Sequence, residues 1–540
     1  MRFAGLLALS LAIAAPVAAQ QALPPPPLTA EQAALKAHVQ FLASDALRGR
    51  EVGTRDYEVA SEYVAAQMLA IGLKPGGAGG WFQPFRLGTF RATDKPSWTL
   101  RRDGKDLPLA FGSDFVSAPT HLPDFTAQGS MVFAGYGIVD PQHGRDDYRG
   151  LDPRGKIVVL VTSTPKGLPT EVQAYVGDIR ERARLAAARG AAAVLFLETP
   201  ALTAQLPKGM KLEAAHDFPS MRWLGPAGTD IRQAPTMSIG LITAAGAPKL
   251  FAGSRIRLAD IAAAEQRGGA MPTGALTGTL SVSGKTSFTT KETRNVLGMI
   301  EGSDPALKDQ VIVLSAHLDH VGVGTAVKGD AIYNGAMDNA VGVSMLLEIA
   351  KSIQESGKRP RRTLVFVALA AEEEGLFGSA YFAHNPTVPK GSIVADVNFD
   401  MPILTYPLVD LVVLGGERSS IGQAVAAAAK AEGLGVVPDP EPQENFFVRS
   451  DHYSFVQAGI PAVSIDTGPG GTGAVAARKF LDENYHKPSD QIDLPFNWDS
   501  AVKYKHVGLS TVQALANGDA RPSWNKGDFF GTLFGGAGAQ

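Results

Sequence analysis

Short apolar segments alternate with helical patterns through the second half of the chain, beginning at about residue 290. The segments expected to form strands are 310–315, 363–370, 393–399, 409–414 and 462–465. The helical patterns between and after them cover 341–353, 419–432 and 501–516. Continuous apolar strands separated by helices are typical of a sheet that is buried on both faces. The sequence therefore predicts an α/β fold with a mostly parallel sheet sandwiched by helices.

Polar residues of ligand type stand close to where these strands are expected to end. In an open α/β sheet, binding sites form at the carboxyl ends of the strands. The residues at these positions are His317, Asp319, Asp338, Glu372, Glu373 and Asp400, and His486 follows in a later loop. One such residue alone is usually a solvated surface residue. Their coincidence favours a binding site, because buried charges are costly unless they are paired or bound to metal.

The composition restricts which ligands such a site can use. The chain contains no cysteine, so a metal must be held by histidine, aspartate and glutamate. Zinc accepts imidazole nitrogen and carboxylate oxygen, and two ions about 3.5–4 Å apart need a bridging carboxylate. The formal net charge of -3 leaves no basic excess for a phosphate backbone. Nucleic acid is therefore not an expected partner.

Five motifs between residues 317 and 490 resemble one known set in their order and content. They are His317-x-Asp319, Asp338-Asn339, Glu372-Glu373-x-Gly375, Asn398-x-Asp400 and Tyr485-His486-x-x-x-Asp490. Together they look like the motif set of the dinuclear zinc aminopeptidase family. That family also contains glutamate carboxypeptidases, glutaminyl cyclases and the ectodomain of the transferrin receptor. The resemblance implies the zinc exopeptidase fold.

The resemblance implies a site for two zinc ions per chain. His317 and Asp400 are expected to bind one ion, and Glu373 and His486 the other. Asp338 is expected to bridge the two ions. These roles come from matching the family motifs residue by residue.

Four further residues receive roles from the same resemblance. Glu372 is expected to act as the general base and then as the general acid. The Asp319 side chain should orient His317 by contacting its second ring nitrogen. Tyr485 is expected to stabilise the oxyanion through its hydroxyl group. Arg449 falls in a stretch that lines the substrate site in relatives, although a structural ion pair would explain it equally well.

The function implied is removal of the N-terminal residue from peptide substrates. A carboxypeptidase or dipeptidase of the same fold is the alternative, but a carboxypeptidase needs cationic groups for the C-terminal carboxylate. A glutaminyl cyclase keeps one zinc ion and needs fewer ligands. A non-catalytic binding ectodomain would have lost ligands, and every ligand position of the motif set is filled here.

The first residues have the pattern of a signal peptide at 1–19. Arg2 supplies a positive charge, the segment 3–15 is apolar, and small residues precede Gln20. A membrane anchor is the alternative, but Pro16 ends the apolar stretch before the roughly 20 residues that a spanning helix needs. We therefore expect a periplasmic or secreted protein without stable membrane insertion. The sequence does not predict the oligomeric state.

The expected domain organisation has a second domain inserted into the catalytic one. Residues 20–125 form the N-terminal part of the catalytic domain, and 286–520 the remainder. Residues 126–285 resemble the protease-associated domain that many family members carry, with the likeness concentrated at Gly135-Tyr136-Gly137 and at 155–159. The Gly-rich end, 521–540, is expected to be a flexible tail.

Overall fold

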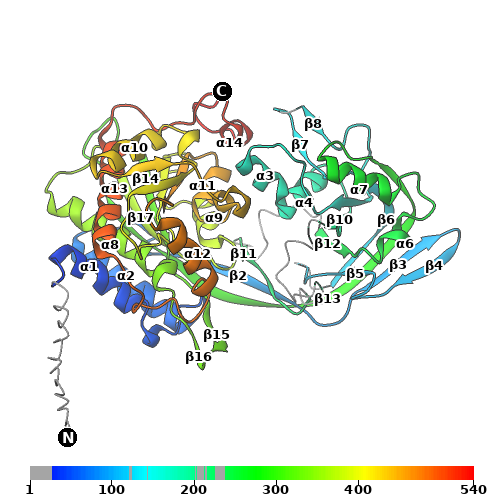
Figure 1. Cartoon of the computed structure of the whole chain (residues 1–540), viewed down its shortest axis with the longest axis horizontal. Helices are drawn as coiled ribbons and strands as arrows, with labels where there is room; N and C mark the ends of the chain where they lie inside the picture. The colour runs from blue at the N-terminus through cyan, green and yellow to red at the C-terminus, as the bar shows by residue number, and fades with distance from the viewer. Residues whose placement is uncertain are drawn as a thin grey trace, which may run out of the picture.

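The computed structural model describes residues 27–540 except 121–123, 143, 201, 203–211, 213–215 and 226–236. The expected signal peptide at 1–19 lies outside the described residues. Two bodies lie side by side, and the long strand β13 (Gly274–Ile300) runs from one into the other (Figure 1). Among the described residues, no helix combines the length and the apolarity needed to cross a bilayer.

The larger body is built around a sheet whose four central strands are parallel. In spatial order these are β21 (Ala462–Thr467), β18 (Ile393–Asn398), β14 (Val311–His317) and β17 (Thr363–Leu369). The outer strands are β19 (Asp410–Leu414) and β20 (Gly435–Val437) beyond β21, and β13, β2 (Phe82–Ala92), β11 (Ser220–Leu224) and β1 (Lys74–Pro75) beyond β17. This sheet confirms the predicted fold class.

Helices cover both faces of this sheet. The side chains of β14 alternate between the two faces and are apolar on both, so both faces need a cover. Ile312 and Leu314 point into a core shared with the helices of one face, whereas Val311 and Val313 point into the core on the other. The first face is covered by α1 (Ala30–Leu42), α2 (Arg55–Ile71), α8 (Val341–Glu355), α10 (Ile421–Ala431) and α13 (Trp498–Asn517). The second carries α11 (His452–Gln457), and α9 (Phe377–His384) contributes side chains to both cores.

The smaller body has its own sheet, in the order β4-β3-β13-β6-β9-β10-β12-β5. Its strands are β3 (Ser97–Arg102), β4 (Lys105–Leu109), β5 (Phe115–Val116), β6 (Asp124–Phe133), β9 (Ile157–Val161), β10 (Ala193–Leu197) and β12 (Met237–Ile242). Its helices are α3 (Thr170–Gly177), α4 (Ile179–Ala187), α6 (Ala247–Phe251) and α7 (Leu258–Arg267). Small hairpins pair β7 (Val139–Asp140) with β8 (Arg145–Asp146), and in the larger body β15 (Gly322–Val327) with β16 (Asp330–Tyr333).

The smaller body begins earlier in the chain than the sequence predicted. The hairpin of β3 and β4 belongs to its sheet, and Trp98 and Leu100 are buried in its core. The expected boundary at 126 is therefore too late. At the other end there is no linker, because β13 pairs with β6 up to Lys285 and with β2 from Thr286 onward.

The end of the chain is packed, so the expected flexible tail at 521–540 is wrong. Helix α14 (Phe529–Leu533) lies against the catalytic body, and Trp524 and Phe530 are buried. The Trp524 indole donates a hydrogen bond to the Gly459 carbonyl at 2.9 Å. Burial of these aromatic rings outweighs the conformational freedom of the Gly-rich sequence.

Candidate metal centre

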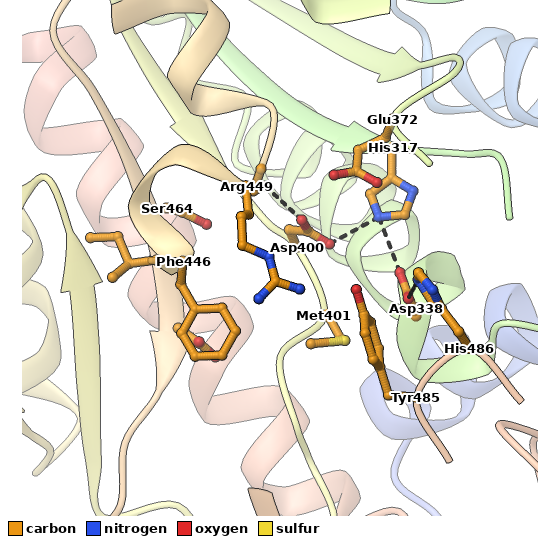
Figure 2. Close-up of a pocket in the computed structure, with 13 residues that line it drawn as sticks. His317, Asp338, Glu372, Asp400, Met401, Phe446, Arg449, Ser464, Tyr485 and His486 are labelled. Atoms are coloured by element: carbon orange, nitrogen blue, oxygen red, sulfur yellow. Dashed lines mark hydrogen bonds and ion pairs between the residues drawn. The ribbon is translucent and has the colours of Figure 1, made fainter. Parts of the chain in front are cut away.

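The carboxyl ends of the parallel strands bring the predicted polar residues together. His317 is the last residue of β14, Asp400 follows β18, and Glu372 and Glu373 follow β17. Asp338 lies in the helical turn η3 (Ala336–Ala340), directly before α8. These elements converge on one pocket, which Figure 2 shows from close by.

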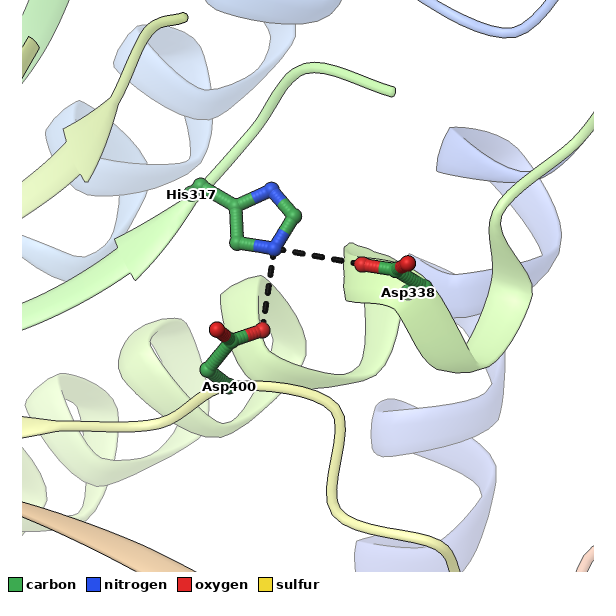
Figure 3. A group of neighbouring side chains, drawn as sticks. All are labelled: His317, Asp338 and Asp400. Atoms are coloured by element: carbon green, nitrogen blue, oxygen red, sulfur yellow. Dashed lines mark hydrogen bonds and ion pairs between the residues drawn. The ribbon is translucent and has the colours of Figure 1, made fainter. Parts of the chain in front are cut away.

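One group of possible metal ligands forms around His317. Its Nε2 atom lies 2.9 Å from Asp400 Oδ1 and 3.2 Å from Asp338 Oδ1 (Figure 3). The His317 side chain is 1% exposed and that of Asp338 5%. The three ligand atoms lie within 4.8 Å of one another, which is close enough for one ion to reach all of them.

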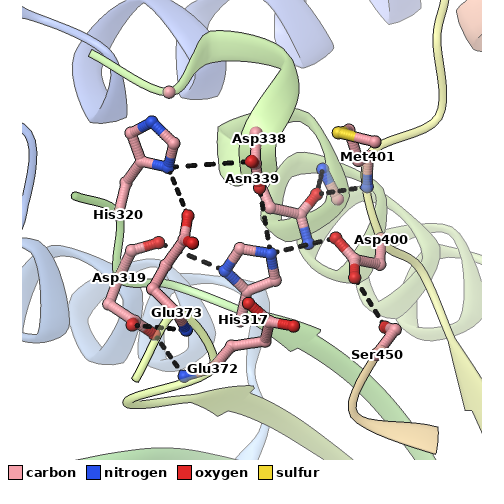
Figure 4. A network of polar contacts seen from close by, with 12 residues as sticks. His317, Asp319, His320, Asp338, Asn339, Glu372, Glu373, Asp400, Met401 and Ser450 are labelled. Atoms are coloured by element: carbon pink, nitrogen blue, oxygen red, sulfur yellow. Dashed lines mark hydrogen bonds and ion pairs between the residues drawn. The ribbon is translucent and has the colours of Figure 1, made fainter. Parts of the chain in front are cut away.

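A second group forms on the other side of Asp338. His486 Nε2 lies 2.9 Å from Glu373 Oε2 and 3.4 Å from Asp338 Oδ2. His320 Nδ1 also lies 2.6 Å from Glu373 Oε1 and 3.9 Å from Asp338 Oδ2 (Figure 4). The two oxygens of Asp338 therefore face different imidazole–carboxylate groups, which is the arrangement that a bridging carboxylate requires. Nitrogen and oxygen donors without thiolate fit zinc.

The two adjacent glutamates differ in their surroundings. Glu372 lines the pocket but belongs to neither group of ligands. Burial raises the pKa of the Glu372 carboxyl well above its ordinary value. The charge of His317 acts to lower this pKa, but the charges of Asp400 and Glu373 act to raise it further. Burial and the charge of Asp338 also act to raise the pKa of Glu373, but His320 and His486 outweigh them and lower it to about 2. Glu373 is therefore held as a carboxylate, as a ligand must be.

Asp319 lies beside His317 but does not make the predicted contact. His317 Nδ1 lies 3.2 Å from the backbone carbonyl of Asp319, not from its carboxylate. The carboxylate instead accepts hydrogen bonds from the backbone amides of Glu372 at 3.3 Å and Glu373 at 3.4 Å. The Asp319 side chain thus holds the loop after β17, and its backbone orients the imidazole.

Three other buried polar residues hold the ligand-bearing loops in place. Arg50 donates hydrogen bonds to the carbonyls of Leu318 and Gly335, and to two others, and so ties the end of β14 to the turn before Asp338. Ser450 donates to Asp400 Oδ2 at 2.5 Å and accepts from Asn398 at 2.7 Å. Such contacts behind the ligands fix the orientation of the ligands themselves.

The pocket extends from these side chains to a wall made of other elements. It encloses about 540 Å³ of space between atoms, its open mouth included. The lining residues are His317, Asp338, Glu372, Asp400, Met401, Leu414, Phe446, Arg449, Ser450, Ser464, Asp466, Tyr485 and His486. Tyr485 stacks on the His486 ring with 3.9 Å between centroids, and its hydroxyl points into the pocket (Figure 2).

Arg449 lies in the pocket wall, away from both groups of ligands. Its side chain donates a hydrogen bond to the Glu444 carbonyl at 3.2 Å and approaches the Glu444 carboxylate at 3.9 Å. It also lies over the Phe446 ring, 5.3 Å from its centroid. Arg449 therefore forms the structural ion pair that the sequence offered as an alternative to a substrate contact. Its guanidinium also borders the pocket.

His320 is the ligand-type residue that the sequence analysis did not count. It follows Asp319 in the same motif, is buried, and its Nε2 atom is buried without a hydrogen-bond partner among the described residues. Its place directly after the His317-x-Asp319 motif was the available signal. The spacing alone did not tell whether its ring would point toward the ligands.

Comparison with known proteins agrees with this geometry over the catalytic body. Residues 295–512 match the model of peptidase family M28. The leupeptin-inactivating enzyme 1 of Streptomyces exfoliatus is 30% identical over 226 residues, which cover 40% of this chain and 45% of that protein. Aminopeptidase Y of Saccharomyces cerevisiae is 29% identical over 232 residues, which cover 42% of this chain and 39% of that protein. The chain thus spans less than half the length of these curated relatives.

Among solved structures, an aminopeptidase from Aneurinibacillus sp. strain AM-1 is similar over 90% of this chain and 94% of its own. Its sequence identity is 20% and its TM-score 0.48.

Proposed function

We propose that the chain is an exported aminopeptidase that uses two zinc ions, because residues 295–512 match the model of peptidase family M28. The observation that carries the proposal is the position of Asp338. Its two oxygens face two separate imidazole–carboxylate groups, while Glu372 borders the same pocket and belongs to neither group. A dinuclear hydrolase needs this combination of a bridge, two terminal ligand sets and a free carboxylate.

In the proposed site, His317 and Asp400 would hold one zinc ion, Glu373 and His486 would hold the other, and Asp338 would contribute to both sets. His320 is close enough to Glu373 to take part in the second set, at 2.6 Å. Bound zinc supplies Lewis acidity, which polarises a substrate carbonyl and makes water a stronger acid.

The other residues of the pocket carry the proton and stabilise charge. Glu372 takes a proton from the attacking water and delivers it to the leaving amine. The Tyr485 hydroxyl points into the pocket, where it can donate to the carbonyl oxygen as negative charge develops there (Figure 2). Asp319 holds the backbone amides of Glu372 and Glu373, so that the two carboxylates keep their different positions.

The choice of an aminopeptidase over a carboxypeptidase rests on the charges of the pocket. A carboxypeptidase needs cationic side chains that bind the C-terminal carboxylate of its substrate. Among the residues that line the described pocket, Arg449 is the only arginine or lysine, and it is engaged with Glu444. The proposal of export to the periplasm or the medium rests on the signal-peptide pattern at 1–19.

Peptides blocked at one end or the other test this function. A peptide with a free N-terminus and an amidated C-terminus should be hydrolysed from its N-terminus. The same peptide acetylated at the N-terminus and free at the C-terminus should resist. Mass spectrometry of the products over time distinguishes the two. Hydrolysis of the acetylated peptide from its C-terminus would assign the chain to the carboxypeptidase alternative.

A further inference from the structure

A further carboxylate lines the pocket, on the strand next to the one that Asp400 follows. Asp466 is in the last part of β21, which pairs in parallel with β18 through Asn398 and Ser464. Continuing this register by two residues sets Asp466 beside Asp400. Side chains alternate along a strand, so Ser464 and Asp466 share a face, and both line the pocket.

In the part of the chain that the structure describes, this carboxylate has no cationic partner. Among the described residues, no lysine, arginine or histidine forms an ion pair with Asp466, and its carboxylate is hydrogen-bonded to the adjacent Thr467, whose amide donates at 2.6 Å. The charged side chains near Asp466 include the like-charged carboxylates of Asp400 and Asp439. A carboxylate in such surroundings costs free energy until a cation pairs with it.

The surrounding pocket suits a long aliphatic chain with a charged end. Leu414 on β19 lies opposite Ser464, and Leu414, Met401 and Phe446 line the same pocket as Asp466 with apolar side chains. Arg449 borders the same pocket, but its guanidinium contacts Glu444 and lies over Phe446. It therefore does not neutralise Asp466.

We propose that Asp466 determines specificity by pairing with the basic side chain of an N-terminal lysine or arginine. The aliphatic part of that side chain lies against Met401, Leu414 and Phe446, and its charged end reaches the Asp466 carboxylate. This inference rests on the proposed aminopeptidase function, because it places the N-terminal residue of the substrate in this pocket. It names the substrate class that the site selects.

Lysine and norleucine form a matched pair of ligands for the test, because they share the same linear chain and differ in the terminal ammonium. Binding of each free amino acid to the zinc-loaded protein is measured by calorimetry. We expect lysine to bind at least about tenfold more tightly than norleucine. In Asp466→Asn this preference should disappear while norleucine binding is unchanged. Equal binding of the two by the unaltered protein would overturn the inference, whatever the activity assays show.

Hydrolysis of lysyl-, arginyl- and leucyl-4-nitroanilide gives the second measurement. Asp466→Asn should lower kcat/KM for the two basic substrates by about 30- to 100-fold and leave the leucyl substrate within about threefold. Asp439→Asn is the control, because it removes a nearby carboxylate that does not line the pocket. An equal loss on all three substrates would instead mean that Asp466 binds the common α-amino group, and would also overturn the inference. Lysine-selective binding without hydrolysis of any substrate would contradict the aminopeptidase proposal alone.

Discussion

Glu372 and Glu373 are adjacent and chemically identical, yet the structure places them differently. Glu373 contacts His320 and His486 through different oxygens, at 2.6 Å and 2.9 Å. Glu372 borders the pocket outside both groups of ligands. Their substitutions by glutamine should therefore have different consequences.

Glu372→Gln should abolish most of the activity without removing metal. Glutamine keeps the size of the side chain but cannot accept the proton, and general acid–base catalysis contributes about 10²- to 10⁴-fold. We expect kcat to fall by about that factor while elemental analysis still finds two zinc equivalents per chain. KM should change little, because ground-state binding is intact.

Glu373→Gln is the matched comparison, with the same chemical change one residue away. It removes a charged ligand, so the zinc content should fall toward one equivalent, and added zinc should restore part of the activity. If Glu372→Gln lost metal and Glu373→Gln kept both ions but was inactive, the two roles would be reversed. If both variants were fully active, the pair would be a solvated turn.

The positions of the candidate ligands at the strand ends could be predicted from single residues. The positions of two neighbouring side chains, those of His320 and Asp466, could not be predicted in this way. His317 and Asp400 each end an apolar run that is too short for a helix, which fixes them at the sheet edge. The direction of the His320 ring depends on the loop after β14, which Arg50 ties down through the Leu318 carbonyl. Arg50 comes from a segment far away in the sequence. Asp466 lies near the carboxyl end of a strand, as the other residues of the site do. The sequence predicted that this strand ends at residue 465, so Asp466 was not included.

At the level of elements, the loop that carries His486 is fastened to the turn that carries Asp338. The Asp490 carboxylate accepts hydrogen bonds from the backbone amides of Met337 at 2.9 Å and Asp338 at 3.0 Å. The Asp490 carbonyl accepts a third, from Ala336 at 3.2 Å. These bonds explain the position of Asp490 four residues after His486, and they join the loop of His486 to the turn of Asp338.

Asp490→Ala should therefore weaken metal binding without touching a ligand. It leaves two buried amides without an acceptor, which costs about 2–4 kcal/mol of stability, and loss of such a supporting contact lowers metal affinity about 10- to 100-fold. Competition for zinc with a chelator and thermal unfolding measure the two effects. Asp493→Ala, at an exposed position of the same loop, is the control and should change neither. Unchanged zinc affinity in Asp490→Ala would show that the loop is held by other contacts.

The parallel strands were more predictable than the antiparallel ones. The segments 311–317 and 363–369 are almost wholly apolar because both faces of the sheet are covered, so composition alone marks them. The first part of β13 is rich in glycine, threonine and serine and partly exposed, so only its last residues, 296–300, form an apolar run. Its length follows from pairing with β2 on one side of Lys285 and with β3 and β6 on the other. Those partners could not be identified from periodicity.

At the scale of the whole molecule, the inserted body contacts the catalytic body close to the pocket. Arg418 of the catalytic body pairs with Glu171 at the start of α3 and with Asp528 at 3.0 Å. Its guanidinium lies over the ring of Phe447, the neighbour of Phe446 in the pocket wall. Tyr175 of α3 packs edge-on against Phe530 of the C-terminal helix. The packed chain end thus forms part of this contact between the two bodies.

From this contact we expect the inserted body to restrict access of long peptides to the pocket. Glu171→Gln removes the charge that joins α3 to Arg418 but leaves Arg418 paired with Asp528, so the catalytic body should stay folded. Loosening the contact by about 1 kcal/mol should raise kcat/KM for a decapeptide about fivefold relative to an aminoacyl-nitroanilide. The ratio of the two rates is the measurement, because it cancels differences in zinc loading.

Glu417→Gln makes the same change at an exposed residue next to Arg418 and should leave the ratio unaltered. An unchanged ratio in Glu171→Gln, together with a lowered unfolding temperature that shows the contact was broken, would mean that the inserted body does not control access.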